Sequence, residues 1–431
     1  MTLGLWEIDV PLPTMMSVRQ ELRHAPIDLE HLETLLADEW ARFGLAEHID
    51  RQDDVAILVG SRGIAALVTV VTETVKAVKL AGGTPFVVPS MGSHGGATAE
   101  GQIEVLEALG VTEERIGCPI RSTMDTVEIG STPSGLPVRL DRYAASADGI
   151  IVINRVKPHT HFRGFVESGL CKMLALGAGN HVQAKAIHSH GSTGLARLIP
   201  EFAETAIEHA PIIAGLALIE DGGHQLSHLE AIKASEILER EPALLEAARN
   251  YLARLPLEDI DILIIDRIGK DLSGMGMDTN VTGRIGALDL AGFDRPRIGC
   301  IVVLDLTDAT HGNATGIGLA DIVTARLDSK IDWDSTYANS LTAQSPRAAA
   351  RPIVAPNDRA AIGAAIKWLA GAPRPEGQRI VRITTTLDLE EVWLSPGALV
   401  AARENGWEFT HHHGEPLQFS STGELMAPKR H

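Results

Sequence analysis

The sequence has few cysteines, few aromatic residues and no long apolar run. Its three cysteines, Cys118, Cys171 and Cys300, are widely separated and form no CxxC pair, so neither a disulfide framework nor a cysteine-built zinc or iron–sulfur site is expected. Aromatic residues make up 4% of the chain, which predicts a mainly aliphatic core. No run of about 18 apolar residues occurs, and the N-terminus lacks a basic segment followed by an apolar one. We therefore expect a cytoplasmic protein without a signal peptide or a membrane span.

Positive charge is also scarce. The 38 lysines and arginines face 56 aspartates and glutamates, and the resulting net charge of −18 argues against a general affinity for nucleic acid or anionic membranes. An anionic small-molecule substrate would therefore need a locally positive pocket. The segment around residues 155–172 can supply one, with the side chains of Arg155, Lys157, Arg163 and Lys172.

Short aliphatic runs alternate with helical patterns along the 431 residues. The runs that predict strands are 55–60, 84–89, 148–154 and 212–220, followed by 261–269 and 297–306. Helices are predicted between them, for example at 98–110 and 357–371. This alternation is typical of βαβ units with parallel strands.

We therefore predict an α/β fold of two domains with largely parallel sheets and an interdomain cleft. Residues 1–255 are expected to form the first domain, which carries the cofactor and the catalytic residues. Residues 256–407 are expected to form the second domain and to close the cleft. The tail, about 408–431, is expected to pack back on the first domain.

Three loops that follow predicted strands carry candidate functional residues: Arg62, His94 and His159. Ligands of parallel α/β sheets gather beyond the carboxyl ends of the strands, which is where these loops lie. A guanidinium such as that of Arg62 can bind a carboxylate or a phosphate at two points. His94 stands among glycines, which allow the backbone to approach a ligand closely. Taken singly, each residue also fits an ordinary surface loop.

The segment 159–190 contains an unusual number of histidines and a lysine in apolar surroundings. The histidines are His159, His161, His181, His188 and His190. Lys172 lies in GLCKMLALGAG, and an ammonium buried there without a partner would be costly, so the amine is expected to be neutral, paired or used covalently. A desolvated lysine is a nucleophile, although a side chain reaching solvent from a helix end fits the sequence equally well.

Other interpretations of these residues stay open. His159 and His161 could be two ligands of a zinc- or manganese-dependent hydrolase, although such a site also needs ligands from later strands. A protein that binds hydroxy acids without catalysis is a further alternative. GAGNHV (177–182) lacks the third glycine of a dinucleotide fingerprint. The three histidines 411–413 are expected in a solvated loop.

Taken together, the motifs resemble the nickel-pincer nucleotide-dependent lactate racemase family. The resemblance consists of Arg62 after a strand, SHGGAT with His94, KPHTHFRG with His159, GLCKMLALG with Lys172, and AIHSHG with His188. Their order and spacing fit the family over residues 55–190. A looser match, GMDTNVTGR, occupies residues 276–284.

The resemblance implies that the protein holds a nickel-pincer nucleotide, the nickel pyridinium-3,5-bisthiocarboxylic acid mononucleotide. Lys172 would be the covalent tether of this cofactor, and His188 would be the protein's nickel ligand. Gly60, Ser61 and Arg62 would lie along the cofactor, with Arg62 orienting the substrate carboxylate. His94 and His159 would be the two acid–base residues, one for each antipode, because an imidazole can take up and release protons near neutral pH.

The implied reaction is racemisation or epimerisation of a 2-hydroxy acid by reversible hydride transfer to the tethered cofactor. The sequence departs from the lactate-specific pattern, since Val59 stands where those members have an aspartate, and since His161 competes with His159 for the role of second base. In the second domain, the candidates for substrate contact are Asp278, Thr279, Asn280 and Arg284. These departures leave open which 2-hydroxy acid is the substrate.

Overall fold

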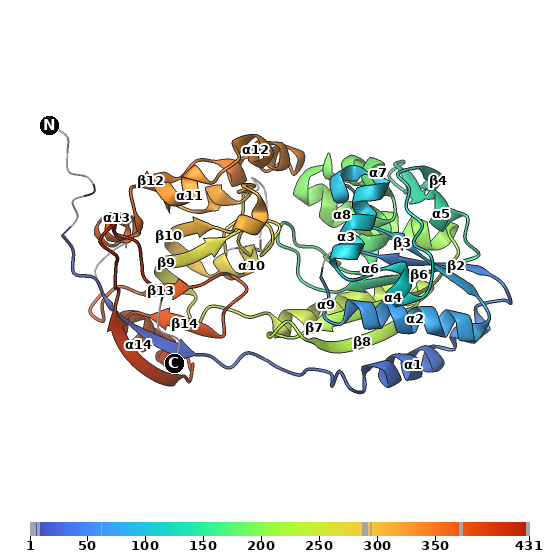
Figure 1. Ribbon diagram of the computed structural model, residues 1–431, viewed down its shortest axis with the longest axis horizontal. Coiled ribbons are helices and arrows are strands. Elements are labelled where there is room, and N and C mark those ends of the chain that lie inside the picture. The colour runs from blue at the N-terminus through green and yellow to red at the C-terminus, as the bar shows by residue number, and fades with distance from the viewer. Residues whose placement is uncertain are drawn as a thin grey trace. The chain divides into compact units, whose positions relative to one another are not determined.

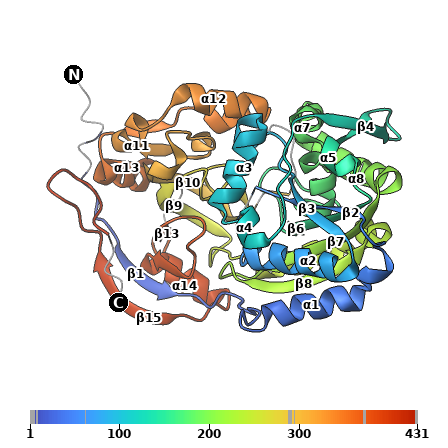
Figure 2. The same ribbon diagram turned by 45° about the vertical axis from the view of Figure 1, so that its right-hand side comes forward.

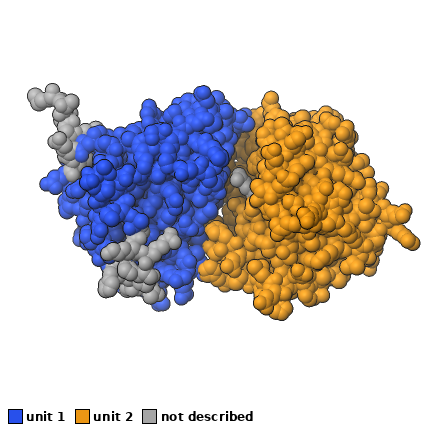
Figure 3. Space-filling model, in the orientation of Figure 1, with its two compact units in different colours: residues 1–22, 253–431 blue, residues 23–252 orange. Residues whose placement is uncertain are grey.

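The computed structural model describes residues 6, 9–61, 63–286, 292–293, 295–369 and 374–427, without the side chains of 369 and 410–413. The chain divides into two compact units (Figure 3). Unit 2 comprises residues 23–252. Unit 1 comprises the described residues of 1–22 and 253–431.

Unit 2 contains a five-stranded sheet in the order β3-β2-β6-β7-β8, in which only β7 and β8 pair in antiparallel fashion. Its strands are β2 Asp54–Val59, β3 Thr84–Pro89, β6 Gly149–Arg155, β7 Ile212–Glu220 and β8 Leu226–Lys233, with a separate hairpin of β4 Thr126–Ser131 and β5 Pro137–Asp141. Its helices are α1 Leu32–Phe43, α2 Leu67–Ala81, α3 Ala99–Ala108, α4 Glu113–Ile116, α5 Arg142–Ala145, α6 Leu170–Lys172, α7 Asn180–His188, α8 Gly191–His209 and α9 Ile237–Tyr251, with a π-helix at Met173–Gly177 between α6 and α7.

Helices cover both faces of this sheet. On one face, α1 and α2 lie side by side (Figures 1 and 2), and their apolar residues form one core with those of β2, β6 and β7. Leu216 of β7 belongs to this core, whereas its neighbour Gly215 faces the other way, because successive strand residues point to opposite faces. A Cβ at Gly215 would lie 2.5 Å from a methyl of Leu170 in α6 and 3.2 Å from one of Ile237 in α9. Glycine at this position therefore allows α6 and α9 to pack directly on the second face.

Unit 1 contains an eight-stranded sheet in the order β12-β11-β10-β9-β13-β14-β1-β15. Its strands are β1 Thr14–Arg19, β9 Asp259–Ile268, β10 Arg297–Leu306, β11 Ile322–Thr324, β12 Ile353–Ala355, β13 Ile380–Ile383, β14 Glu391–Leu394 and β15 Thr410–Pro416. Its helices are α10 Thr279–Thr282, α11 Ala325–Ser329, α12 Trp333–Thr342, α13 Asp358–Ala364 and α14 Pro396–Glu404. The five strands from β12 to β13 pair in parallel, and the other pairs are antiparallel.

The central strand of unit 1 is buried on both faces. Ile262 and Ile264 of β9 belong to one apolar cluster, and Leu263 and Ile265 belong to another. A parallel strand that is covered on both faces usually has a continuous apolar sequence, as β9 does. The predicted α/β fold with largely parallel sheets is therefore confirmed.

The ends of the chain depart from the predicted organisation. The division at residues 252 and 253 lies close to the expected one, but residues of 1–22 join unit 1, since β1 pairs with β14 and β15 (Figure 2). The tail likewise adds a strand to this sheet instead of packing back on the first domain. Residues 411–413, expected in a solvated loop, lie in β15. Pairing between residues nearly 400 positions apart leaves no local signal in the sequence.

Candidate active site

The candidate residues of unit 2 gather at one edge of its sheet. Val59, at the end of β2, lies opposite Pro89 of β3 and Ile153 of β6. The loops that follow these three parallel strands therefore begin at the same edge. They contain residues 60–61, 90–94 and 157–172, in agreement with the place where parallel sheets hold their ligands.

Ser61 and His94 meet across two of these loops, where the Ser61 hydroxyl and His94 Nδ1 form a hydrogen bond. The loop around His94 depends on glycine. Gly95 has a φ of +63°, and a Cβ there would lie 2.4 Å from the carbonyl carbon of Gly101. Only glycine combines this left-handed backbone with so close an approach. The glycines beside His94 thus shape the loop that places its ring.

His159 and Lys172 are in direct contact, with 2.8 Å between Nε2 of the imidazole and Nζ of the amine. The other ring nitrogen of His159, Nδ1, accepts a hydrogen bond from the backbone N–H of His161 at 3.0 Å. A neutral imidazole carries one proton, so this pattern assigns the proton to Nε2. The Nε2–H group then donates to Lys172, and only an unprotonated amine can accept. The geometry thus describes a neutral lysine next to a neutral histidine.

His161 and His188 belong to the same electrostatic cluster. Burial lowers the pKa of His159 well below its usual value, and a positive charge on Lys172 or His161 would lower it further. Burial lowers the pKa of His188 to about 4, again with contributions from Lys172 and His161. Lys172 and His188, sixteen positions apart in the chain, therefore act on one another in the fold. Near neutral pH both His159 and His188 are uncharged. The lone pair of His159 accepts the N–H of His161, whereas that of His188 could bind a metal.

Buried charges fix the backbone of the loop that carries His159. Lys157 and Ser168 close its base with two backbone hydrogen bonds of 2.8 and 3.2 Å. Glu167 is fully buried, and its Oε2 accepts the N–H of His159 at 2.6 Å. The carbonyl of His159 accepts from Arg163 at 2.6 Å. The ring of His159 also packs on Phe162, with 4.4 Å between the ring centroids.

The segment that carries Lys172 packs closely against the strand-end loops. The carbonyl of Gly169, just before α6, accepts a 2.7 Å hydrogen bond from the side-chain amide of Asn154 in β6. Met173 begins the π-helix, and a Cβ at Gly60 would lie 3.0 Å from its terminal methyl. Gly60, predicted to lie along the cofactor, thus makes room for the residue that follows Lys172. At the other end of the π-helix, Gly177 accepts a backbone hydrogen bond from Gly92 at 3.3 Å.

Residues 21–194 match the family model described as the lactate racemase N-terminal domain. The chain therefore carries a lactate racemase-like N-terminal domain. The matched range contains Ser61, His94, His159, Lys172 and His188. It confirms the predicted resemblance for this part of the chain and supports a function of the racemase family.

Two solved structures are similar to this chain over most of its length. A crystal structure of a protein from Thermotoga maritima is 14% identical, with a TM-score of 0.48, 84% of this chain covered and 90% of that chain covered. The lactate racemase apoprotein from Thermoanaerobacterium thermosaccharolyticum is 13% identical, with a TM-score of 0.44 and coverages of 88% and 86%. No curated protein sequence matches the chain.

Two of the four cations expected to form a positive pocket in the racemase-like domain are neutralised by the protein itself. Arg155 forms an ion pair with Glu220, whose other oxygen accepts the N–H of Ala65 at 2.8 Å. Arg163 pairs with Glu167. These two arginines stabilise the loops around the site. Because the contact with His159 describes Lys172 as neutral, Lys157 is left as the predicted contributor to a positive pocket.

The remaining predicted residues lie elsewhere. Arg62 lies outside the described residues. In unit 1, Asp278 caps α10 by accepting the N–H of Asn280 at 2.8 Å, and Thr279 is fully buried. The guanidinium of Arg284 binds the carboxylate of Asp321 at 2.6 Å and the carbonyls of residues 298 and 319. The substrate-contact role of Thr279, Asn280 and Arg284 stays a prediction, and the structure gives each a local contact or a buried position.

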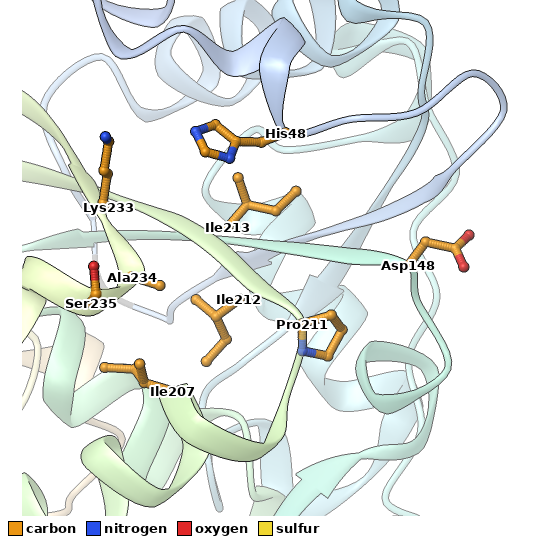
Figure 4. Close-up of a pocket in the computed structure, with 9 residues that line it drawn as sticks. All are labelled: His48, Asp148, Ile207, Pro211, Ile212, Ile213, Lys233, Ala234 and Ser235. Atoms are coloured by element: carbon orange, nitrogen blue, oxygen red, sulfur yellow. The ribbon is translucent and has the colours of Figure 1, made fainter.

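A surface hollow of about 440 Å³ in unit 2 lies away from these residues (Figure 4). Asp148 precedes β6, Pro211 precedes β7, and Lys233 ends the antiparallel β8, so the hollow is at the opposite edge of the sheet.

Within the described parts of the chain, no group of three or more His, Cys, Asp and Glu residues is arranged to hold a metal ion. Nor does the described structure contain a helix with the length and apolar character needed to cross a bilayer.

Three residues that organise the site were not among the sequence candidates: Glu167, Glu241 and Arg249. Glu167 carries a signal that could have been used, because it is an acidic residue among apolar neighbours, eight positions after His159. Glu241 and Arg249 lie on α9, outside the matched range 21–194. Their relation to the site arises only when α9 packs on the sheet.

Proposed function

We propose that this protein is a racemase or epimerase of 2-hydroxy acids that uses a nickel-pincer nucleotide. The contact between Lys172 Nζ and His159 Nε2, with His188 in the same electrostatic cluster, is the observation that carries the proposal. It joins an amine prepared for covalent attachment, an imidazole able to bind a metal and a second imidazole able to move a proton. The match of residues 21–194 to the racemase domain supports this combination.

The residues present fit this cofactor. Attachment requires a nucleophilic amine, and the hydrogen-bond pattern of His159 leaves Lys172 unprotonated. A late first-row metal suits an imidazole ligand, and His188 remains neutral down to about pH 4. Lys172 would thus hold the nucleotide through Nζ and His188 would hold its nickel. When bound, the cofactor supplies an acceptor for the hydride of the substrate's C2 carbon.

The histidines would handle the hydroxyl proton. His159 is neutral near physiological pH, because burial lowers its pKa. To accept this proton at Nε2, the ring would have to take the other tautomer, with a proton on Nδ1 in place of the hydrogen bond that Nδ1 accepts from His161. His94 lies on a neighbouring loop and is oriented by Ser61, and it would serve the opposite antipode. One histidine would thus take up the hydroxyl proton of one antipode, and the other would supply the proton to the hydroxyl of the opposite antipode.

The substrate would be a small anion held outside the carboxyl edge of the sheet. Arg62 is proposed to orient its carboxylate, with weaker contributions from Thr279, Asn280 and Arg284. We propose a cytoplasmic enzyme whose partner is this small molecule, without nucleic acid or membrane.

The proposal is tested with cofactor-loaded protein and a panel of 2-hydroxy acids labelled with deuterium at C2. Chiral chromatography should show inversion of at least one acid, and both antipodes should retain the label, because hydride leaves and returns without exchange with water. Inversion with loss of the label would indicate proton abstraction instead. Tight stoichiometric zinc with hydrolytic turnover, or binding of hydroxy acids without inversion under full cofactor loading, would contradict the proposal.

A further inference from the structure

Helix α9 lies behind the candidate site and contacts both of its reactive segments. It packs against α6, which ends at Lys172, and against β7 on the face opposite α1 and α2. Two of its side chains, those of Glu241 and Arg249, reach the segments that carry Lys172 and His159. Because α9 begins at Ile237, the match to residues 21–194 assigns no role to it.

Arg249 is connected to His159 through Glu167. Its Nη2 atom binds Oε1 of Glu167 at 2.7 Å. The second oxygen of the same carboxylate accepts the backbone N–H of His159 at 2.6 Å. The Glu167 side chain has no exposed surface, whereas that of Arg249 is 34% exposed, so Arg249 brings a cation from the surface to a carboxylate that water does not reach. A buried carboxylate depends strongly on such a partner.

Glu241 fixes the start of the segment that carries Lys172. Its side chain is fully buried, and Oε2 accepts the backbone N–H of Cys171 at 2.8 Å. Gly169 is required beside it, because a Cβ there would lie 2.4 Å from the other carboxyl oxygen. The residue held by Glu241 directly precedes Lys172. A shift of this turn would therefore change the distance between Nζ and the ring of His159.

We propose that α9 is the positioning element of the site: Arg249, through Glu167, and Glu241, through Cys171, together set the contact between His159 and Lys172. Neither residue touches the reacting groups, so both act through the backbone segments that they hold. The inference deepens the proposed function, on which the roles of His159 and Lys172 rest. The contact joins two side chains of the protein itself, so it can be measured independently of turnover.

Replacing Arg249 by leucine tests the first connection, with R240L as the matched control. Arg240 is also on α9 and also pairs with a glutamate, Glu230, at 2.7 Å, but the pair lies on the surface. In cofactor-free protein with ¹⁵N-labelled histidine, NMR should show the neutral Nε2–H form of His159 from pH 6 to 8 in the wild type and in R240L. In R249L the ring should lose this single form and titrate within that range. If R249L does not fold, R249K is used in its place. It keeps the positive charge but loses the planar guanidinium, and its His159 spectrum should lie between those of the wild type and a fully released ring.

Replacing Glu241 tests the second connection through the reactivity of Lys172. An amine-reactive reagent is applied to cofactor-free protein at pH 7.5, and peptide mapping compares Lys172 with the exposed Lys185 of α7. In E241L the labelling ratio of Lys172 to Lys185 should fall at least about tenfold, because an amine released to water is almost wholly protonated at this pH. E241Q keeps an oxygen acceptor for Cys171 and should retain most of the wild-type ratio.

The outcomes separate the positioning role from the proposed function. The positioning role is overturned if R249L and R240L leave the same His159 spectrum, or if E241L labels Lys172 as the wild type does. The proposed function is judged separately, by attachment of cofactor to Lys172 in the wild type. Altered His159 and Lys172 signals in the α9 variants, with no attachment in the wild type, would retain the positioning role and refute the cofactor chemistry.

Discussion

The two units build the carboxyl edges of their parallel sheets from different chemistry. Near this edge in unit 1, cations meet carboxylates: Arg382 binds Asp266 with two hydrogen bonds of 2.9 Å, and Lys330 lies 3.0 Å from Asp305. At the edge of unit 2, the amine of Lys172 meets an imidazole instead. A carboxylate holds its cation in the charged form, whereas an imidazole leaves both groups able to be neutral. Both edges therefore contain fixed ion pairs, in unit 2 that of Arg155 with Glu220, but only the described edge of unit 2 also pairs an amine with an imidazole so that both can be neutral.

This difference supports placing the proposed function in unit 2. Catalysis requires groups whose protonation changes near the working pH or whose lone pairs are available, and perturbed pKa values often mark such sites. The pKa values of His159 and His188 are both lowered by burial and by positive charge. Carboxylate pairs such as those of unit 1 instead stabilise the fold.

Removal of the Lys172 amine should have the largest effect, because it deletes the reactive group that distinguishes unit 2 from unit 1. In K172A the cofactor has no attachment atom, so intact mass should show no adduct and racemisation should fall to background. The matched control is K185A, an exposed lysine on α7, which should keep both adduct and activity. Adduct retained in K172A would contradict the assignment.

Replacement of either proposed acid–base histidine should have the next largest effect. H159Q and H94Q should each lower kcat by about 10²- to 10⁴-fold, the usual contribution of a positioned proton-transfer group. The cofactor adduct should remain, which separates catalysis from attachment. H181Q changes an exposed histidine and should be neutral. If H161Q is inactive while H159Q is active, the second base is His161.

A smaller effect is expected on the pH dependence of stability. Native His188 binds a proton only near pH 4, whereas an unfolded histidine does so near 6.5, so the unfolded state takes up more protons between these values. Stability should therefore fall as the pH drops from 6.5 to 4. The full difference corresponds to about 3 kcal/mol in the free energy of unfolding. Urea titrations of the protein made without cofactor should show this loss. H188Q should remove the part of it that comes from His188, leaving the part from His159, whereas H181Q should not change it.

The smallest effect is expected from a substitution in unit 1, at Arg284. R284A removes the guanidinium that binds the Asp321 carboxylate and the carbonyls of residues 298, 299 and 319, which should lower the free energy of unfolding by about 2 kcal/mol. The Lys172 adduct should be unaffected. The measurements are thermal unfolding and KM. A KM that rises with unchanged stability would instead place Arg284 against the substrate.

The sequence predicted the parts of this structure that have a local origin. Strands β3 and β7 occupy the expected residues, because aliphatic runs bounded by glycine or proline mark buried parallel strands. Ser395 and Pro396 start α14, with the serine hydroxyl accepting the N–H of Ala398, which is a local cap with a clear sequence signature. The convergence of His94, His159 and Lys172 on one sheet edge followed from strand order and the family motif.

The remaining features depend on contacts between distant segments. β1 joins unit 1 by pairing with strands more than 370 residues away, and no periodicity within residues 14–19 specifies this partner. The neutral state of Lys172 follows from one backbone donor, the N–H of His161, whose direction is set by the fold. In the sequence, Glu241 and Arg249 of α9 cannot be told from ordinary charged residues of a helix. Their roles depend on the contacts with Cys171 and Glu167, which arise only in the folded protein.

A crystal structure of the cofactor-loaded protein tests the central claim most directly. We predict continuous density from Lys172 Nζ through one nucleotide to a nickel ion coordinated by His188, with His159 beside the same molecule. Nickel on His188 without a covalent bond at Lys172, or the two side chains facing different bound molecules, would contradict the account.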